Sequence, residues 1–371
     1  MWREYWTASI DGTIQQVLPS GDQLLVGVNG PWHDYYSTGL GMRRALFSRA
    51  DQTGGELQIL NSDGSVHCRR SGLTPIHIGE DHFLALTADS DLVRCTPDGV
   101  IESSRPLGSD TSAVLRSADW LLAVATDEPL SRGFAPRLAR CTCTLYDTGL
   151  QRTTDFSATG MVPQSLAREF IFGSEMRSAR ISRTDFHGNT VELAELPQVP
   201  ALKDGRIISA GEGVFDINDW SVAYDDQSNR ILVSSASPPH TVGCFDINGR
   251  PEWFTTLGKW CCAGPVRRVK RKYVVATGCG DGVAWLGLDG TWLHHAHTEK
   301  FDPTAPSDVE PGPGESVFAA RCDRVGEFEP GRDEHVALKT DLNSARNAIW
   351  WPVMNALVCW GDSRITVVQR A

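Results

Sequence analysis

YVVATGCGDGVAWLGLDGTWLHH, the stretch from Tyr273 to His295, consists of three apolar runs separated by two breaks. The first run is Tyr273–Ala276, the second is Val283–Leu288, and a third begins at Thr291 directly after Asp289-Gly290. Short apolar runs bounded by glycine and aspartate are typical of β-strands. Asp-Gly between two strands favours a hairpin with a type I′ turn, in which both central residues have positive φ. The stretch therefore predicts consecutive antiparallel strands joined by tight turns.

The same pattern recurs along the chain with a period of roughly 40–50 residues, which is the spacing of solenoid and propeller repeats. In each repeat an apolar run precedes a second apolar segment that ends in a turn. Seven such segments can be aligned: Leu57–Val66, Leu92–Ile101, Cys143–Leu150, Ile181–Val191, Val242–Trp253, Val283–Leu293 and Val325–Val336. The repeat predicts an all-β propeller built from four-stranded blades.

An eighth repeat is divided between the two ends of the chain. Ala356–Trp360 and Arg364–Val368 are expected to be its second and third strands, and Tyr5–Ile10 its outer strand. Pairing the N-terminal strand into the last blade would close the ring and protect its edges. We therefore expect a single propeller domain over residues 1–371, with eight blades preferred and seven as the alternative.

The repeat resembles those of the pyrroloquinoline-quinone-like, or quinoprotein-like, bacterial propellers. The resemblance covers nearly the whole chain and is carried by the apolar strands and the Asp-Gly or Asn-Gly turns, such as Asp63-Gly64 and Asn248-Gly249. No Trp-Asp dipeptide ends the repeats, so WD40 propellers are a poorer match. The resemblance implies an architecture and not an activity, because one fold hosts many functions.

Composition narrows the class of partner and the compartment. The formal net charge of −11 argues against a nucleic-acid partner, whose phosphates attract basic surfaces. The basic run from Arg267 to Lys272 is expected to be a solvated hairpin tip. The N-terminal sequence lacks the apolar core of a secretion signal, and no apolar run is long enough to span a membrane. We expect a cytoplasmic protein with reduced thiols and no membrane partner.

Four long segments interrupt the repeat, and all are predicted to lie on one face of the ring. Connections between the third and fourth strands of each blade are tight turns, whereas the long segments join second to third strands or one blade to the next. They are residues 29–55, 126–137, 197–219 and 297–315. In 197–219 the sequence Phe215–Asn218 nearly copies Phe245–Asn248, which indicates an extra hairpin or a degenerate blade. Four insertions on one side suggest a built surface.

Candidate binding residues lie in or beside these segments. Tyr, Trp and Arg are enriched in binding hot spots, although aromatic side chains in loops also pack the loops onto a ring. The candidates are Trp32, His33, Asp34, Tyr35, Tyr36, Arg43, Arg132, Asp219, Trp220 and Trp351. The innermost strands, which line the central channel, supply a second set: His77, Arg116, Gln164, Arg267 and Asn347, with Trp350 and Trp351 in the eighth repeat.

No metal site or cofactor is expected. His295 and His297 would share one side of a strand while His294 faces away, so a three-histidine site would require a departure from strand geometry. The cysteine spacings, including Cys141-x-Cys143 and adjacent Cys261-Cys262, lack the paired pattern of zinc sites and indicate buried thiols. The chain has no Gly-x-Ser-x-Gly, His-Glu-x-x-His or phosphate-loop motif.

Two functions remain open from the sequence. The first is a cytoplasmic scaffold that recognises a protein or peptide through the face with the long segments. The alternative is a lyase, hydrolase or isomerase that acts on a small, natural-product-like substrate at the mouth of the channel. The aromatic and arginine residues favour recognition, while a concave site with His33 and Asp34 nearby would also suit an enzyme.

Overall fold

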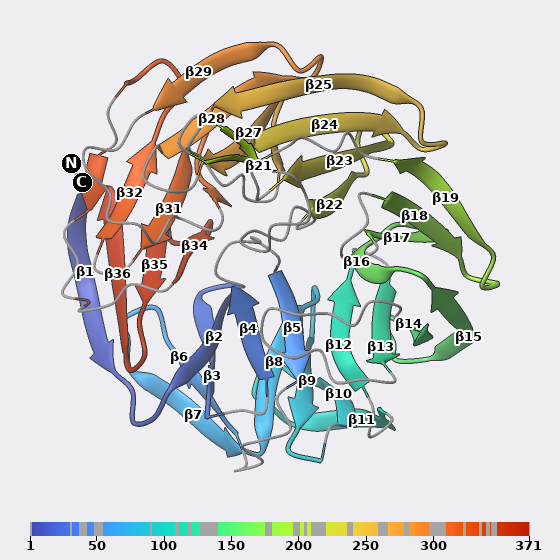
Figure 1. Cartoon of the computed structure of the whole chain (residues 1–371). Helices are drawn as coiled ribbons and strands as arrows, with labels where there is room; N and C mark the ends of the chain where they lie inside the picture. Colours follow the sequence, from blue (N-terminus) through green and yellow to red (C-terminus); the bar gives the residue numbers. More distant parts are fainter. Residues whose placement is uncertain are drawn as a thin grey trace.

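The computed structural model shows an all-β propeller of eight four-stranded blades (Figure 1). It describes residues 2–29, 32–36, 43–47, 55–89, 91–107, 111–117, 120–126, 140–174, 180–195, 201–203, 206–208, 220–235, 240–258, 266–277, 282–296, 309–321, 324–333, 336–338, 342 and 347–370. Within these residues there is no helix, and hence none that could cross a membrane. The preferred count of eight blades is confirmed.

Each blade is an antiparallel sheet whose first strand lies innermost, against the channel, and whose fourth lies at the rim (Figure 1). Blade 1 consists of β2 (Ile14–Ser20), β3 (Gln23–Val28), β6 (Glu56–Leu60) and β7 (Val66–Ser71). Blade 2 consists of β8 (Leu73–Ile78), β9 (Phe83–Thr87), β10 (Asp91–Cys95) and β11 (Ile101–Pro106). Blade 3 contains β12 (Thr111–Arg116), β13 (Trp120–Thr126), β14 (Arg140–Asp147) and β15 (Arg152–Thr159). Blade 4 contains β16 (Val162–Leu166), β17 (Phe170–Ser174), β18 (Arg180–Asp185) and β19 (Thr190–Glu195).

The second half of the ring repeats this order. Blade 5 consists of β22 (Trp220–Asp225), β23 (Arg230–Ser235), β24 (His240–Asp246) and β25 (Pro251–Gly258). Blade 6 consists of β26 (Arg267–Val269), β27 (Lys272–Thr277), β28 (Gly282–Gly287) and β29 (Trp292–Ala296). Blade 7 contains β30 (Glu310–Pro311), β31 (Val317–Arg321), β32 (Arg324–Phe328) and β33 (Val336–Leu338). Blade 8 combines β34 (Asn347–Trp351), β35 (Ala356–Trp360) and β36 (Arg364–Arg370) with the N-terminal strand β1 (Trp2–Ser9).

The two ends of the chain close the ring in blade 8, as the sequence predicts. Strand β1 pairs with β36 from Trp2 opposite Arg370 to Ser9 opposite Arg364. Both terminal strands also bind blade 7 through the buried carboxylate of Glu327. The Trp2 indole donates to Glu327 over 2.7 Å, and the Arg370 guanidinium pairs with the same carboxylate. The closure is therefore fastened by a backbone ladder and by side chains that reach the preceding blade.

Apolar side chains fill every interface between neighbouring blades. Eight buried clusters are present among the described residues, one for each of the eight interfaces. At the closing interface, Trp351 and Ile365 of blade 8 pack with Leu24 and Val26 of blade 1, all at most 1% exposed. Burial of such side chains is worth about 1.5–3 kcal/mol each. The core is thus a ring of interfaces rather than one central mass.

The tight turns between third and fourth strands differ from the predicted type I′ geometry. In the turn at Asp63-Gly64 only the glycine has positive φ, at 83°, and its N–H donates to the Asn61 carbonyl over 2.9 Å. The neighbouring strands slip by one residue at Leu60, which marks a bulge. A type I turn followed by a left-handed glycine satisfies this pattern. The Asp63 carboxylate accepts the Ser65 N–H over 2.9 Å, which explains aspartate at this position.

These turns also serve as docking points between blades. The Trp253 indole of blade 5 donates to the Leu288 carbonyl in the turn of blade 6, over 3.1 Å. A Cβ on Gly290 of that turn would clash with the same indole. Trp6 makes the equivalent bond to Ser62 at the turn of blade 1, over 2.7 Å. We call the face with these turns the tight-turn face, and the opposite one, with the connections between second and third strands, the long-loop face.

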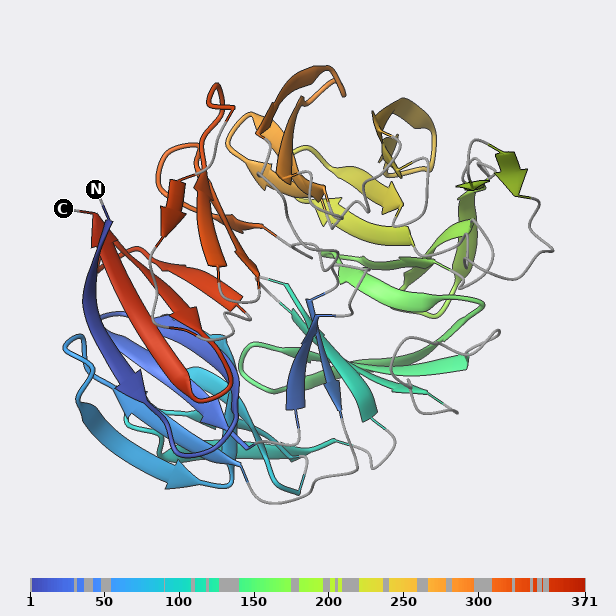
Figure 2. The same ribbon diagram turned by 60° about the vertical axis from the view of Figure 1, so that its left-hand side comes forward.

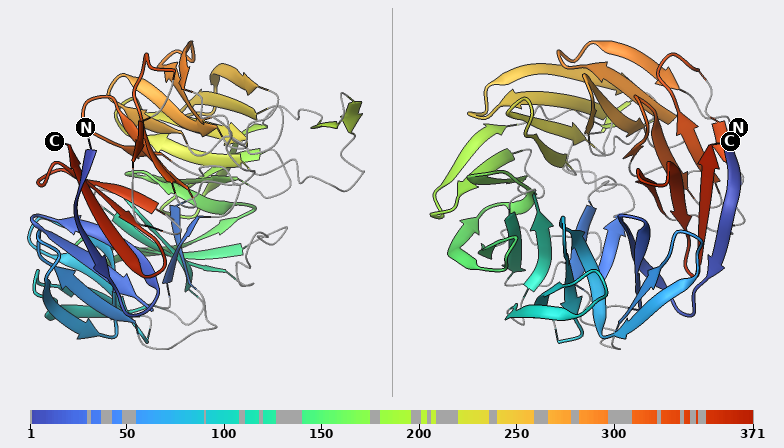
Figure 3. Two further views of the ribbon diagram at one scale, coloured as in Figure 1. Left: turned by 90° about the vertical axis from the view of Figure 1, so that its left-hand side faces the viewer. Right: turned by 180° about the vertical axis from the view of Figure 1, so that it is seen from behind.

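Two hairpins are added to the propeller on the long-loop face (Figures 2 and 3). Within residues 29–55, β4 (Trp32–Tyr36) and β5 (Arg43–Phe47) form the first hairpin. Within residues 197–219, β20 (Ala201–Lys203) and β21 (Arg206–Ile208) form the second. An extra hairpin is one of the two forms that the sequence predicts for this segment. Phe215–Asn218, which suggested it, lies outside the described residues.

Candidate functional site

The first hairpin extends the sheet of blade 3 into the ring. Although β4 and β5 follow β3 of blade 1 in sequence, β5 pairs with the innermost strand β12, with Ala45 opposite Val114 and Leu46 opposite Ala113. The result is a six-stranded sheet that ends in β4, which also runs close to β2 of blade 1 (Figure 1). The hairpin therefore links blades 1 and 3 across the long-loop mouth of the channel.

Six of the candidate binding residues belong to this hairpin. Trp32, His33, Asp34, Tyr35 and Tyr36 form strand β4, and Arg43 begins β5. The register places Tyr36 opposite Arg43 and Tyr35 opposite Arg44. The sequence predicts these residues in a long loop, whereas the structure shows a paired strand segment. The segment is therefore held in place by backbone pairing between β5 and β12 rather than being an irregular loop.

The remaining candidates are separated from this group. Trp220 begins β22, the innermost strand of blade 5, while Arg132 and Asp219 lie outside the described residues. Trp351 does not belong to an exposed face, contrary to the prediction. It is fully buried, and its indole donates to the Gly21 carbonyl over 2.7 Å. Adjacent residues of a strand point to opposite sides, so the pair Trp350-Trp351 is divided between the channel side and the core.

A pocket of about 460 Å³ opens at the other mouth of the channel, on the tight-turn face. It lies at the ends of the innermost strands of blades 1, 2, 3, 7 and 8, where these strands turn back toward the rim. The described residues that line it are Leu18, Pro19, His77, Ile78, Ser117, Glu310, Ile349, Trp350 and Pro352. A volume between about 300 and 1,000 Å³ with mostly apolar walls and few polar groups is usual for small-molecule sites.

The aromatic wall of the pocket is held rigidly. One face of Trp350 stacks on Phe318 of blade 7, with ring centroids 5.7 Å apart and planes at 13°. Trp2 meets Trp350 edge-on at 6.3 Å. On the opposite wall, the Ser117 hydroxyl accepts the Trp120 N–H over 3.2 Å, which orients it at the end of β12. The pocket is thus preformed by contacts that do not involve a ligand.

His77 and Trp350, both predicted to line the channel, meet in this pocket. Arg116, Gln164, Arg267 and Asn347 also lie on innermost strands, as predicted. Glu310 is not among the residues predicted to line the channel, because it falls in residues 297–315, which the sequence predicts as a connection. In fact β30 begins at Glu310 and is the short innermost strand of blade 7. Its two residues carry too little periodicity to be recognised as a strand.

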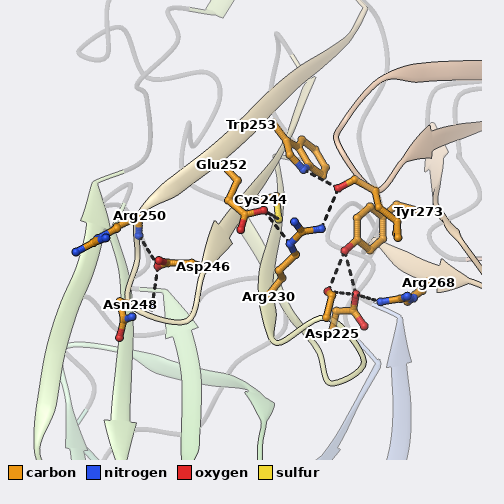
Figure 4. Close-up of polar contacts among 12 residues, drawn as sticks. Asp225, Arg230, Cys244, Asp246, Asn248, Arg250, Glu252, Trp253, Arg268 and Tyr273 are labelled. Carbon is orange, nitrogen blue, oxygen red and sulfur yellow. Dashed lines mark hydrogen bonds and ion pairs between the residues drawn. The ribbon is translucent and has the colours of Figure 1, made fainter.

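A buried polar cluster joins blades 5 and 6 and includes one residue of the basic run (Figure 4). The carboxylate of Asp225, whose side chain is only 3% exposed, accepts from Arg268 over 2.7 Å and from the Tyr273 hydroxyl over 2.9 Å. Ser228 donates to it as well. Lys272 pairs with Glu315 of blade 7 over 2.5 Å. Arg268 and Lys272 are therefore engaged in contacts between blades, whereas Lys270 and Arg271 at the tip of the hairpin are exposed, as the sequence predicts.

Electrostatics explain how this carboxylate tolerates burial. Burial alone raises the pKa of Asp225, but the hydrogen bonds from Ser228, Arg268 and Tyr273 and the charge of Arg268 together outweigh it. The pKa consequently lies below its usual value. A charge that is paired and hydrogen-bonded in this way is a structural element, because removing one partner leaves the others buried and unsatisfied. Sequence offered no signal for this cluster, whose members are distant along the chain.

The histidines near residue 295 make separate contacts. His294 donates to the Arg332 carbonyl in the turn of blade 7 over 2.7 Å, and His295 contacts the Thr277 hydroxyl within its own blade at 3.0 Å. His297, Cys261, Cys262 and Cys279 lie outside the described residues. In the part of the chain that the structure describes, no group of three or more His, Cys, Asp or Glu residues is arranged to hold a metal ion.

The six described cysteines are free thiols, and five of them are buried. Cys141 and Cys143 pack at the interface of blades 3 and 4, on the same side of β14, as their spacing predicts. Desolvation raises the pKa of Cys95 and of Cys244 to about 12, and it also raises the pKa values of Cys143 and Cys359. Because the thiolate is the reactive form, these thiols should be inert in the folded protein.

We expect alkylation with iodoacetamide at pH 8 to show this protection. Cys95, Cys143, Cys244 and Cys359 should stay unmodified in the native protein and react fully in denaturant, with peptide mass spectrometry as the measurement. Cys68, which is only partly buried, is the internal control and should be modified first among the six. Rapid native labelling of any of the four would show that their blade interfaces open.

Comparison with known proteins identifies the fold only. No protein-family model and no curated protein sequence matches the chain. Among solved structures, BamB from Moraxella catarrhalis matches over 100% of both chains, with a TM-score of 0.57 and 15% identity. A catalytically inactive virginiamycin B lyase from Staphylococcus aureus with quinupristin also matches over 100% of both chains, with a TM-score of 0.50 and 11% identity. The resemblance to pyrroloquinoline-quinone-like propellers is thereby confirmed as an architecture.

Proposed function

We propose that the protein is a cytoplasmic recognition scaffold that binds a protein or peptide partner through the long-loop face. The observation that supports this proposal is the β4–β5 hairpin, which crosses from blade 1 and extends the sheet of blade 3 (Figure 2). A strand that ends a sheet offers backbone groups for an added peptide strand, which is a common mode of peptide recognition. Within the described residues, no further strand pairs with the outer edge of β4.

The residue types on the hairpin agree with recognition. Strand β4 carries one Trp and two Tyr residues in five positions, and β5 begins with two Arg residues. These are the residue types that dominate binding energy when they lie near the centre of an interface. One of the similar structures, virginiamycin B lyase, is an enzyme by its name, and one fold can host many functions. The fold is therefore compatible with both recognition and catalysis.

A triple variant tests the scaffold. Trp32→Ala, Tyr35→Ala and Trp220→Ala each remove a candidate anchor, and truncating an anchor of this kind costs about 2 kcal/mol of binding free energy. Partners recovered by pull-down from native lysate with the unaltered protein should therefore be absent with the variant. Quantitative mass spectrometry of the two eluates is the measurement.

The matched control removes three aromatic side chains from the rim. Tyr5, Phe254 and Trp292, each 40–48% exposed on an outer strand, are replaced by Ala. This control should retain every partner, and both variants should melt close to the unaltered protein. Partners that persist with the hairpin variant, or that are lost equally from both variants, would contradict recognition through the long-loop face.

An enzyme at the channel is the second candidate function, and the pocket on the tight-turn face is the observation in its favour. His77 of blade 2 and Glu310 of blade 7 both line this cavity. Imidazole and carboxylate groups are those most used for general acid–base catalysis. For this candidate the proposed chemistry lies at the mouth opposite to the one that the sequence favours.

A further inference from the structure

The innermost strand of blade 3 carries a strand from elsewhere in the chain on the edge that faces the channel (Figure 1). In the other seven blades the innermost strand is the last strand of its sheet among the described residues. The added strand is β5, which comes from the first repeat and runs antiparallel to β12. We call this edge of β12, over Thr111–Arg116, the inner edge. It accepts an extended segment that is not part of its own blade.

Contacts within the ring hold β12 in place independently of the hairpin. On its other side β12 pairs with β13 at five positions along its length. Val114 packs in the cluster between blades 2 and 3, and Leu115 packs in the cluster between blades 3 and 4. Both side chains are at most 7% exposed. The inner edge is therefore preorganised for a strand, because β12 does not have to be ordered when one binds.

The hairpin is joined to the inner edge by a shorter ladder. Strand β5 pairs with β12 at two positions, with Ala45 opposite Val114 and Leu46 opposite Ala113. Neither β4 nor β5 is one of the four strands of a blade, so releasing them breaks no ladder within the eight blades. A local opening of this kind costs less free energy than unfolding of the ring.

A strand that displaces β5 has to offer more pairing than β5 does. The hairpin is tethered beside the edge that it covers, which gives it a high effective concentration, so an identical hairpin of a second copy does not outcompete it. A longer segment gains backbone hydrogen bonds along the rest of the six-residue strand β12. The present occupant places Leu46 and Ala45, an aliphatic and a small residue, at the two paired positions. The matching ligand is an extended peptide segment that contains such a pair.

We propose that the inner edge of β12 is a docking site for an extended segment of a partner protein, and that the β4–β5 hairpin closes this site in the free protein. The partner segment pairs antiparallel with β12 in place of β5. The hairpin is thus an autoinhibitory element. This goes beyond the scaffold proposal, in which the hairpin is itself the binding surface, and it does not depend on Trp32, Tyr35 or Trp220.

Three forms of the full-length chain test the exchange. In the closed form, Leu46→Cys and Ala113→Cys allow a disulfide between directly opposite residues, whose Cα atoms lie about 4.5–5.5 Å apart in an antiparallel pair. In the open form, Ala45→Pro removes a backbone N–H from β5 and so disrupts its pairing. The unaltered protein is the third form. Apart from Ala113, no residue of the eight blades is changed, so each form should melt cooperatively.

The probe is a fluorescein-labelled peptide that copies residues 41–49, and fluorescence anisotropy is the measurement. The open form should bind it at least tenfold more tightly than the unaltered protein does, because no tethered strand competes. The oxidised closed form should not bind it, and reduction with dithiothreitol should restore the affinity of the unaltered protein. A control peptide with proline at the position of Ala45 has the same charge and should bind none of the forms.

No saturable binding to the open form, or equal binding to the oxidised and reduced closed form, would overturn the proposal. An open form that melts without cooperativity would also overturn it, because the hairpin would then be a structural part of blade 3. A dimer of the unaltered protein that the oxidised closed form cannot make would assign the inner edge to a second copy and refute the partner segment. Because the probe is a purified peptide, these outcomes are distinct from failure of the scaffold in the pull-down.

Discussion

Deleting Arg364–Ala371 is expected to abolish cooperative unfolding. The deletion removes β36, which lies between β1 and β35 and therefore provides two of the three backbone ladders of blade 8. It also removes Ile365, Val367 and Val368, each at most 1% exposed. At about 1.5–3 kcal/mol per buried side chain, this burial alone approaches the net stability of a typical domain, about 5–15 kcal/mol. Circular dichroism during heating is the measurement, and a sigmoidal transition like that of the intact chain would contradict closure through β36.

A circular permutant is the control for this deletion. Trp2 lies opposite Arg370 in the β1–β36 register, so a short Gly/Ser linker can join the two strands. New ends opened in the tight turn between Asp98 and Gly99 leave every strand present. The permutant should unfold cooperatively, because blade 8 keeps its central strand. If the permutant also unfolds without cooperativity, an open ring does not explain the loss of cooperative unfolding in the truncated chain.

Replacing Asp225 by Ala is expected to destabilise the protein by about 3–5 kcal/mol at pH 7. The substitution removes the carboxylate that pairs with Arg268 and accepts from the hydroxyl of the fully buried Tyr273. Unpaired buried polar groups retain the cost of desolvation without compensation. Chemical denaturation followed by fluorescence gives the difference in unfolding free energy. Asp226→Ala, which removes the exposed carboxylate next in the chain, should change it by less than about 0.5 kcal/mol.

The pH dependence of this difference identifies the charge as its cause. Because the pKa of Asp225 is lowered in the folded state, its ionised form is favoured by folding. Its contribution is present above the unfolded pKa of about 4 and is lost as the pH falls through the folded value. The gap between the unaltered protein and Asp225→Ala should therefore narrow in acid. A gap that stays constant from pH 7 to acid would assign the loss to packing and not to the carboxylate.

Much of the fold follows from local patterns in the chain. The alternation of apolar strands with turns such as Asp289-Gly290 predicts the blades, because strand pairing and turn chemistry are decided by neighbours in sequence. The count of eight blades and the closing role of the N-terminal strand follow from the same pattern. The predicted turn type was wrong, since the dipeptide does not reveal whether a strand bulges beside its glycine.

Local patterns also assign residues to the channel but not to a site. His77 and Trp350 were predicted on innermost strands, and the structure brings them to one pocket. The sequence alone could not tell which of Trp350 and Trp351 enters the core, because a one-residue shift in register exchanges the two sides of a strand. Only the packing of blade 8 on blade 1 decides that Trp351 is the buried one.

Contacts between residues distant in sequence were decided by the tertiary structure alone. The pairing of β5 with β12 joins residues of the first and third repeats, and Asp225 meets Arg268 and Tyr273 across a blade interface. Glu310 reaches the pocket because β30, only two residues long, takes the innermost place in blade 7. Each of these depends on how far one blade is turned against the next. That angle arises from the packing of whole sheets, so no short stretch of sequence carries it.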